Sequence, residues 1–145
     1  MELKIKKLNL NAKLPTKATA GSAGYDLYAC NEQPIVLEPH TTTAVSLGFC
    51  AQLPQQTVGL IYIRSGIAAK HGIIPANCFG VIDCDYRGEW KVMLHNLTDT
   101  PYTVAPYERV AQLVVTSYYS PEVVEADSLS ETERGEGGFG STGKL

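Results

Sequence analysis

Apolar residues alternate with polar or small ones in several short segments of the chain. A period of two sends successive side chains to opposite faces of a strand, so such segments predict half-buried β-strands. The alternating positions are Leu3 and Ile5 among lysines, Val45, Leu47 and Phe49 among small residues, and Trp90, Val92 and Leu94 between Lys91, Met93 and His95.

Other segments are apolar without alternation. Residues 58–63 and 113–115 are rich in β-branched side chains and predict fully buried strands. One short helix is expected at residues 65–70, with Ser65 as its N-cap and Gly72 as its stop. The 13 glycines and eight prolines supply turns. Many short strands with one helical segment predict an all-β jelly-roll sandwich or barrel.

The pattern ends near residue 128. Residues 128–145 are polar and glycine-rich with a single aromatic side chain, and such a segment buries too little apolar surface to offset its ordering entropy. The sequence therefore predicts one β domain over residues 1–127 and a flexible arm over residues 128–145, which orders when something binds it.

Charge and composition exclude several function classes. The net charge is −3 and the isoelectric point is near 5.6, so we expect no nucleic-acid partner and only local capture of anions. We also expect a cytoplasmic protein with no membrane partner, because no apolar run approaches roughly 20 residues and the first residues do not resemble a signal peptide. The four cysteines lack paired spacing, which predicts reduced, buried thiols and no zinc site: Cys30, Cys50, Cys78 and Cys84.

Three segments carry candidate chemistry. Arg64-Ser65-Gly66, at the junction of a strand and the short helix, combines a guanidinium, a hydroxyl and backbone N–H groups, which suits a phosphate; a plain capped helix remains the alternative. Asp85 to Gly88 has turn chemistry between two β segments and predicts a hairpin. Asp83 stands where a sheet favours an apolar residue, whereas Asp85 is explained as the first residue of the turn.

The C-terminal arm is the third segment. Gly138 and Gly143-Lys144 have the spacing of a phosphate-binding P-loop, but Leu145 replaces the required Ser or Thr, so a P-loop is rejected. A flexible linker explains neither Arg134 nor Phe139. Glycines, the hydroxyls of Ser141 and Thr142, and an aromatic ring favour a lid that closes over phosphates and a base.

Five ordered segments together resemble the motifs of the trimeric dUTPase family, over nearly the whole chain. They are residues 23–29 (AGYDLYA), residues 64–72 with Arg64-Ser65-Gly66, residues 80–89 (GVIDCDYRGE), residues 109–113 (RVAQL) and residues 134–143. Three positions depart from the family pattern: Ile63 stands for a common Pro, Phe79 for a small residue, and Tyr107-Glu108 for Gly-Asp. None of these positions is expected to touch the reacting atoms.

The resemblance implies a homotrimeric jelly roll with shared active sites, in which dUTP is hydrolysed to dUMP and pyrophosphate with Mg²⁺. Asp83 would activate a water for in-line attack on the α-phosphorus. Uracil would be read by the segment from Asn77 to Lys91, including Val81 and Ile82, and Tyr86 would exclude a 2′-hydroxyl. Phosphates and base would be held by Arg64, Ser65, Gly66, Gln112, Arg134, Phe139, Gly140, Ser141 and Thr142. Asp26 would hold waters of the metal or form a salt bridge, for instance with Arg109.

Two other functions fit the same fold. One is a dCTP deaminase, or a bifunctional deaminase and diphosphatase, which needs a carboxylate that transfers protons at the cytosine ring. The deaminase family has a Glu-centred pattern where this chain has Asp83-Cys84-Asp85-Tyr86. A jelly-roll binding protein without catalysis would not need the polar residues that all five motifs retain.

Overall fold

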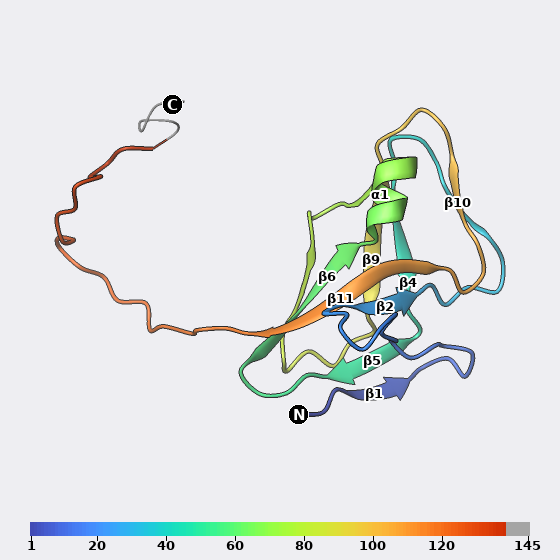
Figure 1. Cartoon of the computed structure of the whole chain (residues 1–145), viewed down its shortest axis with the longest axis horizontal. Helices are drawn as coiled ribbons and strands as arrows, with labels where there is room; N and C mark the ends of the chain where they lie inside the picture. Colours follow the sequence, from blue (N-terminus) through green and yellow to red (C-terminus); the bar gives the residue numbers. More distant parts are fainter. Residues whose placement is uncertain (139–145) are drawn as a thin grey trace.

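The computed structural model describes residues 1–138, in which the chain forms eleven strands and one short helix (Figure 1). This confirms the predicted all-β class. The strands are β1 (Lys4–Lys7), β2 (Tyr25–Tyr28), β3 (Ile35–Leu37), β4 (Thr42–Ser46), β5 (Phe49–Gln52), β6 (Thr57–Ile63), β7 (Ile73–Pro75), β8 (Gly80–Ile82), β9 (Lys91–Asn96), β10 (Tyr102–Val104) and β11 (Arg109–Ser117), and the helix is α1 (Ser65–His71).

The strands pair antiparallel in four small sheets. A four-stranded sheet has the order β2-β11-β6-β8 and a three-stranded sheet the order β4-β9-β7, while β1-β5 and β10-β3 form two-stranded ribbons. One continuous core lies among them, and it includes Leu27, Ile61 and Leu113 from the first sheet with Val45 and Leu94 from the second. The rings of Phe49 and Trp90, whose centroids lie 5.4 Å apart, are fully buried in this core.

Within residues 1–138, strands β6 and β11 are fully buried on one face only, which contradicts the prediction of full burial. Ile61 and Leu113 point into the core, but the alternate positions lie on the opposite face of the four-stranded sheet. There, Val114 faces Leu60, and Leu60 faces Val81. Leu60, Val81 and Val114 form an apolar part of this face, and Val81 is 56% exposed within residues 1–138.

Two local predictions were wrong. Ser65 is not the N-cap of α1: Arg64 holds that position with an extended backbone, its side chain makes no capping bond, and its carbonyl accepts from the N–H groups of Ile67 and Ala68. Gly72 does end the helix, at φ 61°. The alternation from Val45 to Phe49 belongs to two strands, because Gly48 turns the chain at φ 72°. A side chain there would collide with Cys30.

The predicted hairpin around residues 85–88 is also wrong. Strand β8 pairs with β6, whereas β9 pairs with β4 and β7, so the turn connects two different sheets. Strand β8 ends at Ile82, and Asp83 therefore belongs to the connecting loop. The turn itself lies two residues earlier than predicted, since the N–H of Tyr86 donates to the carbonyl of Asp83 at 3.2 Å, so Asp83 and not Asp85 is its first residue. A turn does not by itself determine which strands pair.

The last strand ends at Ser117, and residues 118–138 contain no helix or strand. Residues 116–136 are exposed, and the segment runs away from the body of the domain (Figure 1). The predictions for Phe139, Gly140, Ser141 and Thr142 lie outside the described residues. The four thiols are free, as predicted, but Cys78 is exposed and the others are only partly buried. No helix in residues 1–138 is long and apolar enough to cross a membrane.

Candidate active site

Three of the sequence motifs meet at one end of the four-stranded sheet. Gln112 faces Asp26 on one side and Tyr62 on the other, so their side chains share the outer face. The carboxylate of Asp26 lies 3.1 Å from Nε of Arg64 and 3.1 Å from a terminal nitrogen of Arg109. The salt bridge to Arg109 that the sequence allowed is therefore present, and a second one to Arg64 accompanies it.

The side chain of Gln112 fits into this cluster because the neighbouring Gly24 has no side chain. Its amide nitrogen donates to the carbonyl of Ile63 at 3.3 Å, and its Oε1 lies where a Cβ on Gly24 would be only 2.8 Å away. Gly24 thus makes room for the glutamine. Ser65 and Gly66, in the first turn of α1 beside Arg64, are exposed. We call Asp26, Arg64, Ser65, Gly66 and Gln112 the basic cluster.

The other predicted residues of the chain's centre gather around a pocket of about 310 Å³, here called the loop pocket. It is bounded by β8, the loop after β8 and the start of β9, and is lined by Asn77, Gly80, Val81, Ile82, Asp83, Tyr86, Glu89, Trp90 and Lys91. Strand β8 is an edge strand of its sheet. Backbone N–H and C=O groups on its free edge are therefore available to a ligand.

The loop is held in shape by its own side chains. The ring of Tyr86 lies against Gly88, where a Cβ would be 2.3 Å from the hydroxyl, and this hydroxyl donates to the carbonyl of Glu89 at 3.3 Å. Arg87 donates to the carbonyl of Cys84 at 2.8 Å. The carboxylate of Glu89 accepts from the hydroxyl of Ser46 at 2.5 Å, and this bond, with a smaller contribution from Lys91, lowers the pKa of Glu89.

The basic cluster and the loop pocket's Asp83 are far apart within one chain. Ile82 faces Gly59 on β6, so Asp83 lies beyond that point near Val58, whereas Arg64 follows the opposite end of the same strand. Six residues of extended chain span roughly 20 Å. A carboxylate, a water, a phosphate and a phosphate ligand in mutual contact span only about 10 Å.

Within the described chain, Arg134 lies neither in the basic cluster nor at the loop pocket. It is exposed on the arm, and its Nε donates to the carbonyl of Gly137 at 2.8 Å. Within residues 1–138 no set of three or more His, Cys, Asp or Glu side chains could hold a metal ion. Asp26 is the carboxylate of the basic cluster, and its two oxygens contact Arg64 and Arg109.

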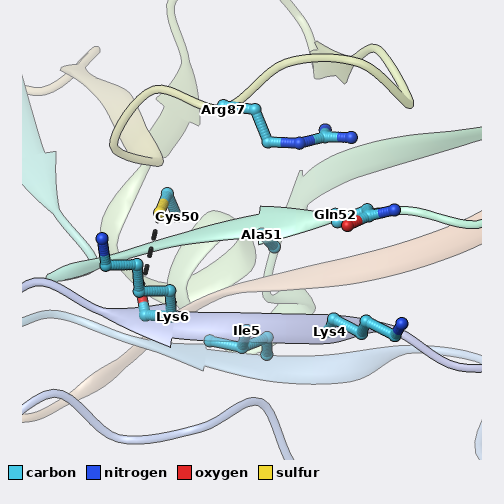
Figure 2. A pocket seen from close by; sticks show the side chains of 7 residues that line it. All are labelled: Lys4, Ile5, Lys6, Cys50, Ala51, Gln52 and Arg87. Atoms are coloured by element: carbon cyan, nitrogen blue, oxygen red, sulfur yellow. Dashed lines mark hydrogen bonds between the residues drawn. The ribbon is translucent and has the colours of Figure 1, made fainter.

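A second pocket, of about 380 Å³, lies between the β1-β5 ribbon and Arg87 (Figure 2). Lys4 and Lys6 line it, but their side chains point to opposite ends of the pocket. Their amines therefore do not converge on one ligand. Among the polar side chains at the loop pocket, Glu89 lines it and Ser46 supports it through Glu89, and neither has a role predicted from the sequence. Glu89 belongs to a recognised motif, but nothing local marks Ser46.

Comparisons with known proteins identify the family of the chain. The dUTPase family model matches residues 10–143. The deoxyuridine 5'-triphosphate nucleotidohydrolase of Helicobacter pylori is 43% identical over 143 residues, which cover 99% of this chain and 97% of that protein. The structure of the Staphylococcus bacteriophage 80alpha dUTPase with dUPNHPP matches with a TM-score of 0.89 at 28% identity, covering 98% of each chain. A dUTPase mutant of the S. aureus phage phi11, whose structure contains a structural Mg(II) ion, shares the fold at 22% identity with a TM-score of 0.82, covering 90% of this chain and 100% of that one. The chain belongs to the dUTPase family.

Proposed function

We propose that the protein hydrolyses dUTP to dUMP and pyrophosphate. The observation that carries this proposal is the loop pocket, because it combines a free strand edge, an exposed carboxylate at Asp83 and the ring of Tyr86 within one cavity of about 310 Å³. A pyrimidine needs in-plane donors and acceptors, and its sugar needs a shaped wall. The loop pocket offers hydrogen-bonding groups for the base and a ring against the sugar. The carboxylate of Asp83, which is able to accept a proton, lies beside them.

Uracil would be recognised by the free edge of β8. Backbone groups of Val81 and Ile82, helped by the amide of Asn77, would pair with the edge of the base, and Lys91 would close the slot. Cytosine exchanges a donor for an acceptor at this edge, so binding it would leave buried polar groups unpaired. That mismatch discriminates more strongly than a lost methyl contact.

Asp83 would act as the general base. Its carboxylate takes a proton from a water, the water oxygen forms a bond to the α-phosphorus, and the bond to the bridging oxygen breaks so that pyrophosphate leaves. An anionic nucleophile attacks a polyanion here, so alignment and charge neutralisation must lower most of the barrier. Arg64, Ser65, Gly66 and Gln112 would provide these contacts to the phosphates.

Mg²⁺ fits the donor set of the basic cluster. This ion prefers oxygen ligands, keeps several waters and binds through substrate phosphates with one or two carboxylates, so no cage of protein side chains is required. The ion would supply charge neutralisation on the triphosphate. Asp26 would contact waters bound to the metal and not the ion itself, because both of its oxygens already bind arginines.

The site would be assembled from different subunits of a homotrimer. Two observations support this. The roughly 20 Å between Asp83 and Arg64 along β6 is too long for one phosphate. The part of the outer face formed by Leu60, Val81 and Val114 is apolar, and Val81 is exposed within residues 1–138. A face of this kind marks a protein interface. Packing subunits through it would bring the loop pocket of one copy to the basic cluster of another.

The arm would close the site. Arg134, Ser141 and Thr142 offer ligands for phosphates, Gly140 allows close approach of the backbone, and Phe139 offers a ring face to the base. The arm is exposed as far as the chain is described, so a ligand that contacts both the ring and the phosphate donors would be needed to hold it.

Pyrophosphate release measured for each deoxynucleoside triphosphate, with and without Mg²⁺, tests the proposal. Among the deoxynucleoside triphosphates, we expect only dUTP to be hydrolysed efficiently, and we expect this hydrolysis to require Mg²⁺. Ammonia release from dCTP, or equal turnover of dTTP and dCTP, would contradict it.

A further inference from the structure

We propose that Glu89 is a positioning residue for the nucleoside, which fixes Lys91 and the turn of Tyr86 at the mouth of the loop pocket. This inference rests on the proposed function and deepens it. Glu89 touches no reacting atom and acts through its neighbours.

The side chain of Glu89 joins the loop to a strand of the other sheet. One oxygen accepts from the hydroxyl of Ser46 on β4 at 2.5 Å, and the other lies 3.3 Å from the ammonium of Lys91. The hydroxyl of Ser46 also accepts from the N–H of Gly48 at 3.0 Å, so its single proton is committed to Glu89. Ser46 is thus oriented by the backbone, and Glu89 is oriented by Ser46.

The main chain of Glu89 holds the other side of the pocket. Its carbonyl accepts from the hydroxyl of Tyr86, whose ring is folded over Gly88. Two residues that would contact the nucleoside, Tyr86 and Lys91, are therefore both tethered to Glu89. Strand β4 supports this arrangement through Ser46.

The ion pair between Glu89 and Lys91 has a second role, which comes from its charges. Asp83, Glu89 and Lys91 all line the loop pocket, and uracil and deoxyribose carry no charge. A free ammonium in the slot would attract the triphosphate and favour a misplaced nucleotide. Pairing Lys91 with Glu89 reduces that attraction while leaving its nitrogen able to donate a hydrogen bond.

The test is a double-mutant cycle with Glu89→Gln and Lys91→Met in the full-length protein. We expect Glu89→Gln to raise KM for dUTP, and the dissociation constant of dUMP measured through Trp90 fluorescence, by about tenfold, a size consistent with loss of a charge-assisted bond. The value of kcat should stay within about twofold. In the Lys91→Met background, Glu89→Gln should change either constant by less than about twofold. Glu38→Gln is the matched control, because Glu38 is exposed and its carboxylate makes no hydrogen bond within residues 1–138.

Each outcome decides the matter. Unchanged KM and dUMP affinity in Glu89→Gln, or an effect of the same size with and without Lys91, would overturn the positioning role. A lower apparent kcat at constant KM, together with a lower melting temperature, would show a purely structural role and also overturn it. Failure of the unaltered protein to hydrolyse dUTP would instead refute the proposed function, which the same assay detects separately.

Discussion

Asp83 and Arg64 lie at opposite ends of strand β6. Asp83 follows Ile82, which faces Gly59, and Arg64 follows Ile63, the last residue of the strand. Both side chains are needed at one phosphate in the proposed reaction, yet the register separates them by roughly 20 Å. A complete site would therefore take Asp83 from one subunit and Arg64 from another.

Replacing Asp83 by Asn should lower kcat by about 10²–10⁴ and leave KM nearly unchanged, because an amide holds a water but does not accept its proton. Steady-state kinetics with dUTP checks this. Asp85→Asn is the matched control, since Asp85 lies in the same loop and should retain most of the activity. Near-normal turnover in Asp83→Asn with loss in Asp85→Asn would transfer the role of base to Asp85.

Tyr86→Ala should relax the selection against ribose, because the ring is the proposed obstacle to a 2′-hydroxyl. We expect the ratio of kcat/KM for dUTP to that for UTP to fall by about tenfold or more. Tyr86→Phe keeps the ring and loses only the bond to the carbonyl of Glu89, so it should still reject UTP. If Tyr86→Ala rejects UTP as strongly as the unaltered protein does, the ring does not select the sugar.

Deletion of residues 134–145 should leave a folded trimer with little activity, because the last strand ends at Ser117. Circular dichroism and light scattering report the fold and assembly, and pyrophosphate release reports the activity. Phe139→Trp adds a direct signal: its emission should change with the imido analogue of dUTP and Mg²⁺, and much less with dUMP. Full activity after truncation, or equal responses to both nucleotides once the Trp90 background is subtracted, would argue against a lid.

Cys78→Gly should stabilise the protein by about 0.5–1 kcal/mol, because Cys78 has φ 64° and a residue with a Cβ is strained in this region. Its exposed side chain loses little packing. Thermal unfolding under reducing conditions measures the effect. Cys50→Gly, in strand β5, should instead lower the melting temperature, and a lower melting temperature for Cys78→Gly would show that the left-handed backbone is not a cost there.

Local patterns predicted the elements better than their pairing. The alternation of Trp90, Val92 and Leu94 predicted a half-buried strand, and β9 has that burial pattern. The turn-forming residues at 85–88 also suggested a hairpin, but the turn spans residues 83–86, and strand pairing depends on contacts between distant segments, which a turn motif does not encode. Gly48 was missed as a break because the alternation of apolar residues continues through it.

The motifs identified the residues that gather in two groups, but they did not predict that the two groups lie far apart within one chain. Several residues between Asn77 and Lys91 line one pocket. Asp26, Arg64 and Gln112 lie together in another region. The separation of the two groups along β6 depends on register, which only the structure gives. Ser46 could not be identified from sequence, because its role comes from a contact with Glu89 across 43 positions of the chain.

Mixing two inactive variants tests the shared site most directly. Asp83→Asn retains the basic cluster and Arg64→Ala retains the general base, so each alone should hydrolyse dUTP very slowly. When the two are unfolded together, refolded in equal amounts and assayed, random assembly should place an intact Asp83 opposite an intact Arg64 in about a quarter of the sites. We predict recovery of about a quarter of the activity of the unaltered protein treated in the same way. Activity that stays at the average of the two separate variants would contradict a site built from more than one subunit.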